Sequence, residues 1–216
     1  MKPLFTYLAG LLLTTAAGAL LSQQVMAAGK NAVQDDESFM PALSMEGGED
    51  AFRYQLGMGY WNKEQSAHGQ FYFSHLEAKD QLKLDDLSLG KQTYRSYRIG
   101  LEANGYEKSK AYQGGLFLYR NKSAANIDRY GLGLALSFGK MLGDKVRLLA
   151  GFELMPEYLS SDWDAKALLE YSLKAGGDIR LTKTIDLGVN YYYGATVDEV
   201  SADHYGKLMA GVSFKL

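Results

Sequence analysis

The sequence contains no cysteine and only three prolines among its 216 residues. The lack of cysteine excludes disulfide bonds, thiolate metal sites and a lipid-modified N-terminal cysteine, so the chain is neither a disulfide scaffold nor a lipoprotein. Positive charge is not in excess either, because 23 basic residues stand against 25 acidic ones. Nothing in this composition would neutralise a phosphate backbone, and no nucleic-acid partner is expected.

Long apolar runs are confined to the N-terminus. There Lys2 precedes an apolar stretch over residues 4–21, which a polar break separates from the small residues Val25, Met26 and Ala27. This order is typical of a secretory signal peptide cleaved after Ala27, and a retained membrane anchor is the alternative. The predicted organisation is a signal peptide over 1–27, a polar lead over 28–37 and one folded domain over 38–216.

The rest of the chain alternates apolar and polar residues with period two, which indicates β-strands. Its 16 tyrosines, nine phenylalanines and 24 glycines suit strands that also meet a membrane–water interface. From 129 to 140, for example, Tyr130, Leu132 and Leu134 share one face, and small or polar residues occupy the other. Residues 70–76 and 111–119 carry aromatics at both parities, so the sequence does not assign their faces.

The polar face separates a membrane barrel from a soluble one. Glycine recurs on it, where a narrow lumen needs small side chains. The segments also exceed the usual length of about five or six residues in globular strands and match a tilted crossing of the membrane. The fold class we predict is an all-β, antiparallel, up-and-down transmembrane β-barrel. The glycines concerned are Gly131, Gly133, Gly139, Gly151, Gly176, Gly188, Gly194 and Gly211.

Links between the segments are alternately long and short, as expected for outer loops and inner turns of a bacterial outer-membrane barrel. This predicts ten strands, the first of them around residues 39–45, with eight strands as the alternative. Residues 46–50 are expected to form an outer tip. The predicted long outer loops are 78–91, 121–128, 158–164 and 198–203.

Four short patterns resemble the YfaZ family of small bacterial outer-membrane proteins. The resemblance implies an outer-membrane barrel without a defined activity, and it transfers no catalytic residue. The patterns are residues 44–49 (SMEGGE), 55–60 (QLGMGY), 156–161 (PEYLSS) and 189–193 (VNYYY).

The C-terminus resembles the assembly signal of outer-membrane barrels, which ends on an aromatic residue after alternating apolar positions. Gly211 and Phe214 match this pattern, whereas the terminal Leu216 replaces the usual phenylalanine. The resemblance implies recognition by the barrel-assembly machinery. The other partners expected are outer-membrane lipid and lipopolysaccharide.

Charged residues of both signs fall on the predicted lumen face, where opposite charges should pair. We expect a closed, salt-bridged interior and a structural or surface-interaction role, because barrels of eight to ten strands leave little space beyond their own side chains. A narrow porin-like channel for small solutes is the alternative. The predicted lumen charges are Arg98, Glu102, Arg147, Glu153, Lys166, Glu170, Lys174, Asp178, Arg180 and Lys207.

Little in the sequence points to catalysis, so no enzyme, cofactor or metal is predicted. The three histidines are expected at strand ends or in loops. His204, beside Asp203 and Ser201, is the candidate base for a membrane-embedded lipid-modifying enzyme, but no nucleophile motif accompanies it, and a solvated loop histidine is the preferred interpretation. The acidic runs 85–86 and 162–164 lack calcium-loop spacing.

Overall fold

The computed structural model describes residues 37–62, 67–84, 87–107, 109–123, 127–161, 167–198 and 201–215. The chain divides into two compact units, Met1–Glu37 and Ser38–Leu216. The predicted signal peptide, its cleavage site and residues 28–36 of the lead lie outside the described residues. In the part of the chain that is described, no helix is long and apolar enough to cross a membrane.

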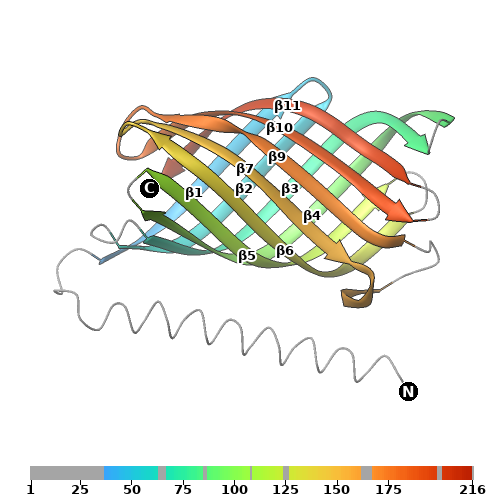
Figure 1. Ribbon diagram of the computed structural model, residues 1–216, viewed down its shortest axis with the longest axis horizontal. Helices are drawn as coiled ribbons and strands as arrows, with labels where there is room; N and C mark the ends of the chain where they lie inside the picture. Colours follow the sequence, from blue (N-terminus) through green and yellow to red (C-terminus); the bar gives the residue numbers. More distant parts are fainter. Residues whose placement is uncertain are drawn as a thin grey trace, which may run out of the picture. The chain divides into compact units, whose positions relative to one another are not determined.

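The second unit is a closed antiparallel barrel (Figure 1). Around the ring the order is β1, β2, β3, β4, β5, β6, β7, β9, β10 and β11, and β11 pairs with β1 to close it. Within the described residues ten strands form the wall, so the prediction of ten strands is confirmed and the eight-stranded alternative is wrong. The strands are β1 Glu37–Gly48, β2 Ala51–Asn62, β3 Ala67–Leu84, β4 Leu87–Glu107, β5 Lys110–Ser123, β6 Ile127–Leu142, β7 Val146–Pro156, β9 Ala167–Arg180, β10 Ile185–Asp198 and β11 Ala202–Lys215. A 3₁₀ turn, η1 (Glu157–Leu159), and the short β8 (Ser160–Ser161) continue β7 along β6.

The apolar residues of the period-two pattern face outward. Because successive side chains of a strand point to opposite faces, each strand adds a column of apolar side chains to the exterior. The result is a continuous apolar belt of side chains that are each at least 41% exposed. These include Met45, Phe52, Leu56, Met58, Phe71, Ile99, Leu101, Leu118, Leu134, Leu136, Phe138, Leu148, Leu173, Leu187, Val189 and Leu208.

The interior is filled by a second set of large side chains. Phe117, Leu82, Met155, Met209, Asn121 and Ser96 are each less than 2% exposed. This set explains the two segments with aromatics at both parities. In β3, Tyr72 points inward and Phe71 outward, while in β5, Tyr119 points inward and Leu118 outward. Aromatics line both faces there because the barrel uses rings as interior filling as well as outer surface.

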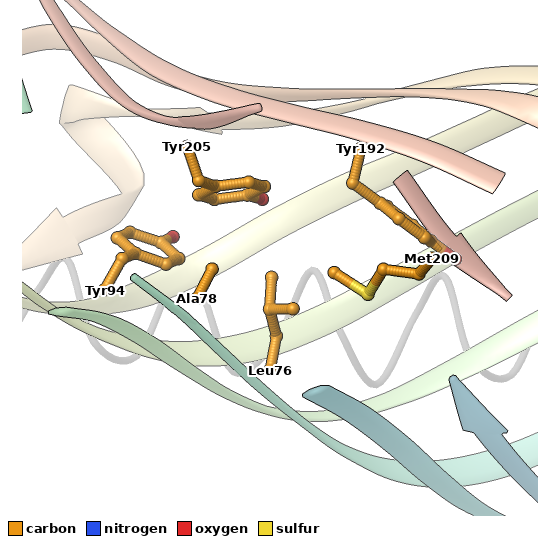
Figure 2. Close-up of a cluster of buried hydrophobic side chains, with 6 residues drawn as sticks. All are labelled: Leu76, Ala78, Tyr94, Tyr192, Tyr205 and Met209. Atoms are coloured by element: carbon orange, nitrogen blue, oxygen red, sulfur yellow. The ribbon is translucent and has the colours of Figure 1, made fainter. Parts of the chain in front are cut away.

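Figure 2 shows one such interior cluster, in which Leu76, Ala78, Tyr94, Tyr192, Tyr205 and Met209 converge from β3, β4, β10 and β11. The rings of Tyr94 and Tyr205 lie 4.9 Å apart, a separation at which aromatic pairs attract. Tyr205 also shares a hydrogen bond of 3.2 Å with Ser172 on β9. The cluster therefore joins both sides of the barrel across its lumen.

The two ends of the barrel differ in construction. We call the end at which β1 turns into β2 and β3 into β4 the hairpin end, and the opposite end, where β1 begins and β11 finishes, the terminal end. The β1–β2 hairpin is short, and beyond it β3 pairs directly with β11 at Lys83–Asp203 and Leu84–Ala202. At the level of this pairing the ring passes from β3 to β11, so eight of the described strands enclose the hairpin end, compared with ten further down.

Side chains reinforce this additional pairing. Asp80 on β3 accepts a hydrogen bond of 3.0 Å from the Gly206 backbone N–H and lies 3.4 Å from Lys207 Nζ. At the short hairpin, the Lys79 N–H donates to the Asp50 carbonyl at 2.7 Å. Lys91 Nζ contacts Asp50 Oδ2 at 2.6 Å, and this hydrogen bond lowers the pKa of the exposed Asp50 carboxyl.

Four sequence predictions about the links are wrong. Residues 121–128 do not form a long outer loop, because β5 continues to Ser123 and β6 begins at Ile127. Residues 78–91 do not form a long outer loop, because β3 and β4 extend through them as a hairpin in which only residues 85–86 lie between the strands. Glu46 is not part of a tip: β1 runs to Gly48, and Glu46 points into the barrel, 7% exposed. β11 already begins at Ala202, within the predicted loop 198–203. In each case cross-strand pairing extends the strands into polar sequence that by itself is typical of loops.

Candidate functional site

The centre of the lumen holds a buried ion pair that the sequence analysis missed. Glu46 on β1 faces Arg53 on β2, with Oε2 and Nη1 2.9 Å apart. The same carboxylate accepts hydrogen bonds from Asn190 Nδ2 at 2.6 Å and the Tyr192 hydroxyl at 2.7 Å. Arg53 in turn donates to Tyr192 and to Gln55. Strands β1, β2 and β10 are thus joined through one carboxylate.

A second central pair comes from the predicted set. Arg98 on β4 lies 2.6 Å from Glu153 on β7, and its guanidinium sits over the Phe117 ring at 4.9 Å. Arg98 also donates to Ser96 at 3.1 Å. Since β4 and β7 are separated by β5 and β6 in the ring, this pair spans the lumen.

Toward the hairpin end the lumen contains a buried polar network around Glu170. Its Oε1 accepts from the Tyr94 hydroxyl at 2.8 Å and from Asn121 Nδ2 at 3.0 Å, and Arg129 Nη1 lies 3.8 Å from Oε2. All four side chains are at most 3% exposed. Arg129 was absent from the predicted set, although its parity places it on the lumen face.

His204 belongs to the same region, and its expected place in a solvated loop is wrong. It lies in β11, 3% exposed, with Nε2 2.5 Å from Thr196 Oγ1 and its ring stacked on Tyr94 at 5.3 Å. Its burial follows from the extension of β11 into the predicted loop.

The other two histidines lie on β3. His75 is in the middle of the strand, with its ring stacked on that of Tyr97 at 4.6 Å. The side chain of His68 lies outside the described part. The acidic runs at 85–86 and 162–164 lie outside the described residues.

Toward the terminal end the lumen opens into a cavity of about 210 Å³. Its floor is the Glu46–Arg53 pair with Tyr192, and its wall continues to residues near the ends of their strands, such as Asn104, Asp186 and Ser213. A volume of this size holds about seven water molecules at roughly 30 Å³ each. A second cavity, of about 10 Å³, also borders Arg53 and Tyr192 but is lined by residues such as Leu76, Ser96 and Tyr205.

Five of the predicted lumen charges line this cavity: Glu153, which pairs with Arg98, and four others. Arg147 and Asp178 pair at 2.8 Å, while Glu102 accepts from Gln70 at 2.5 Å and from Asn104 at 3.3 Å. The fourth, Lys174, extends over the Tyr192 ring, with Nζ 5.4 Å from the centroid.

The remaining predicted charges lie elsewhere. Arg180 approaches Asp186 at 3.8 Å near the terminal end, with its side chain 40% exposed. Lys207 contacts Asp80 near the hairpin end at 3.4 Å. Lys166 lies outside the described residues. Apart from Glu102 and Lys174, the described members of the set therefore lie in separate ion pairs at several levels of the barrel instead of one network.

The predicted assembly strand is β11. Gly211 lies opposite Glu46 on β1 and Gly188 on β10, and Phe214 lies opposite Leu43 on β1 and Ile185 on β10. Leu216 lies outside the described residues. A Cβ atom at Gly211 would fall 2.2 Å from the Met45 carbonyl oxygen and 2.7 Å from Glu46 Cγ. The missing side chain thus leaves the space through which Glu46 reaches the lumen.

We expect Gly211→Val to weaken the β1–β11 pairing, because its branched side chain meets backbone and the Glu46 side chain. Overpacking of this kind costs about 1–3 kcal/mol. The matched control is Gly47→Val in the same pairing, where a Cβ atom would meet nothing within 4 Å. Urea unfolding of both variants in lipid vesicles measures the difference, and equal stability would contradict this role of Gly211.

Comparisons with known proteins give fold-level likeness only. No family model matches the chain, and no curated protein matches it. Among solved structures it is similar to OmpT of Vibrio cholerae, with 10% sequence identity and a TM-score of 0.37, over 77% of this chain and 56% of OmpT. It is also similar to the NanC porin, with 13% identity and a TM-score of 0.40, over 83% of this chain and 100% of NanC. A third similar structure is Neisserial surface protein A, with 15% identity and a TM-score of 0.32, over 84% of this chain and 100% of that protein. The chain thus spans about half the length of OmpT, and scores this low give no support for a shared activity.

Proposed function

We propose that this protein is a small bacterial outer-membrane β-barrel with a closed lumen, acting as a structural or surface-interaction protein. The observation that carries the closed lumen is the packing of its centre and hairpin end. There the Glu46–Arg53 and Arg98–Glu153 pairs and the buried network around Glu170 fill the cross-section. A solute entering from the terminal end would stop at the floor of the cavity.

The exterior supports the membrane location. Exposed apolar side chains surround the barrel, whereas a water-soluble protein rarely exposes more than a few hundred Å² of contiguous apolar surface. A barrel also leaves no unpaired strand edge, which a hydrocarbon environment requires. The belt therefore fits a lipid-facing surface.

The borders of the belt support the same location. Toward the terminal end, Tyr112 and Phe138 pack edge to face at 6.3 Å. Toward the hairpin end, His75 and Tyr97 stack, and directly beyond them Glu77 and Arg95 form an exposed ion pair at 2.8 Å. Aromatic rings followed by charges are typical of a membrane–water interface.

The finer parts of the proposal follow from the sequence. The N-terminal segment would direct export and be removed after Ala27, and the strand ending in Phe214 would engage the barrel-assembly machinery. Lipid and lipopolysaccharide would surround the belt. Membership of the YfaZ-like family would agree with this architecture. We assign no catalytic role to any residue.

Planar-bilayer recording of the purified protein tests the closed lumen. We expect no discrete conductance steps, because the buried pairs and rings leave no continuous aqueous path. A known porin reconstituted in the same membranes is the positive control. Reproducible single-channel steps would instead establish the second candidate, a narrow porin-like channel, for which the cavity at the terminal end would be the entrance.

Heat-modifiable gel mobility tests the membrane barrel itself. The protein extracted from outer membranes should migrate differently before and after boiling, since such barrels resist detergent until heated. Recovery of the protein in the soluble periplasmic fraction would contradict the proposed location.

A further inference from the structure

We propose that the cavity at the terminal end is a binding site for a small oxyanion that also carries a hydroxyl group, with Lys174 as the anchor for its charge and Asn190 as the acceptor for its hydroxyl. Inorganic phosphate and short hydroxy acids belong to this class. The proposal goes beyond the closed-barrel function, because it gives the lumen a ligand without requiring passage through it.

The first observation concerns the charges around Lys174. The charged groups that act most strongly on its ammonium are Glu46, Arg53, Arg147 and Asp178. These form two ion pairs of their own, at 2.9 Å and 2.8 Å. Lys174 is thus a third cation beside two carboxylates that already have partners. Among the described residues no carboxylate lies within 4 Å of its ammonium, which lies over the Tyr192 ring.

An ammonium group inside a barrel is costly when no anion accompanies it. A small anion entering the cavity would compensate this charge without breaking either existing pair. Among the described residues that line the cavity, the other charge without an opposite partner is Glu102 on β4, four strands around the ring from β9. Its carboxylate accepts from two side-chain amides of its own wall.

The second observation is a buried acceptor beside Lys174. Asn190 is 6% exposed and lines the cavity, and its Nδ2 donates to Glu46 while Oδ1 has no hydrogen-bond partner among the described residues. Buried polar atoms in proteins are rarely left unpaired, since this costs the full desolvation of the group. Since Oδ1 itself is covered by the wall, the Asn190 amide would turn toward the cavity to accept a hydrogen bond from a ligand hydroxyl, which would supply the missing donor.

The strand register brings these two groups together. Lys174 pairs with Tyr192, and Asn190 pairs with Gly176, so Lys174 and Asn190 are diagonal neighbours on the lumen face. Diagonal neighbours in an antiparallel pair lie roughly 7–8 Å apart, which one small ligand can bridge. Gly176 has no side chain to separate them: a Cβ atom there would lie 2.5 Å from Asn190 Oδ1.

The size of the cavity limits the ligand. A volume of about 210 Å³ accommodates phosphate or a three-carbon hydroxy acid but is below the roughly 300–1,000 Å³ of pockets for drug-sized molecules. A lipid carrying a phosphate headgroup would not fit. The floor formed by Glu46 and Arg53 makes the site blind, so the ligand would bind from the terminal end and leave the same way.

The experiment is calorimetric titration of the full-length protein, in a detergent without phosphate groups, with inorganic phosphate and with sulfate at neutral pH. Phosphate carries a hydroxyl donor at this pH, whereas sulfate has none. We expect saturable phosphate binding that is about ten- to hundredfold tighter than sulfate binding. A short-chain phosphatidic acid in the same titration distinguishes free phosphate from a lipid headgroup, and only free phosphate should bind.

The variants separate the anchor from general effects on the barrel. Lys174→Met should lose about ten- to hundredfold in phosphate affinity, and Lys174→Arg should recover most of it. Lys207→Met is the matched control, because Lys207 also points inward but pairs with Asp80 outside the cavity. Heat-modifiable mobility checks that each variant is folded.

Three results would overturn the proposal. The first is the absence of saturable phosphate binding to the folded wild-type protein, and the second is an equal loss of affinity in Lys174→Met and Lys207→Met. The third is equal affinity for phosphate and sulfate. It would show that Asn190 accepts no hydrogen bond from the ligand, and the proposed class of hydroxyl-bearing oxyanions would then be wrong. None of these results bears on conductance or location, so the proposed function would be judged separately.

Discussion

Replacing Glu46 by alanine is expected to lower the free energy of unfolding by about 3–5 kcal/mol, the cost of breaking a buried ion pair from one side. The carboxylate accepts from Arg53, Asn190 and Tyr192 at 2.6–2.9 Å. Without it, three donors on two strands lose their acceptor, and the Arg53 charge is left in the lumen. Urea unfolding in lipid vesicles, followed by tryptophan fluorescence, measures the loss.

The control for this prediction is an exposed ion pair. Asp128→Asn removes a partner of Arg120 at 2.7 Å, but both side chains are more than one third exposed, so a loss below about 1 kcal/mol is expected. The double variant Glu46→Leu with Arg53→Met should be more stable than Glu46→Ala, since it removes both charges together. If the double variant is no better, the buried charge of Arg53 is not the cause of the loss.

Arginine at Leu173 is expected to cost about 2–4 kcal/mol, the measured range for a cation on the lipid face near mid-membrane. Leu173 lies near the middle of β9 and is 45% exposed on the apolar belt. The matched control is Ser137→Arg, because Ser137 lines the cavity and a long side chain there can reach water. Unfolding in lipid vesicles again gives both values.

The adjacent Ser172 would be a poor control, although its parity is that of the lumen face. It is 5% exposed and hydrogen-bonded to Tyr205, so arginine there would overpack the interior and break that bond. Equal losses for Leu173→Arg and Ser137→Arg would argue against a lipid-facing belt, because a water-facing surface accepts arginine at both.

Much of the barrel is determined locally. The period-two pattern places Leu134, Leu173 and Val189 on one face of their strands whatever their neighbours are, since side chains alternate along any strand. The same rule puts Arg98, Glu153 and Glu170 on the other face. Closure then follows from hydrogen bonding, because ten strands with an apolar face have no other way to pair every edge.

The tertiary structure alone decided which charges meet. Arg98 pairs with Glu153, which lies three strands away in the ring. The tilt of the strands places the two residues at the same level of the barrel, and no local sequence pattern encodes that tilt. The length of β1 was also decided there. Residues 46–50 are polar and glycine-rich and are typical of a turn, yet pairing with β11 holds Glu46 in the strand and aims it at Arg53.

The hairpin end shows the same division. Residues 78–91 mix six charged residues with four leucines, and the sequence by itself did not distinguish a hairpin from a loop there. Their extension as a β-hairpin depends on β11, which offers a free edge above the short β1–β2 hairpin and pairs with Lys83 and Leu84. That edge exists only once the barrel has formed. The backbone groups of β3 and β11 that pair there are more than 100 residues apart in the sequence, so only the fold brings them together.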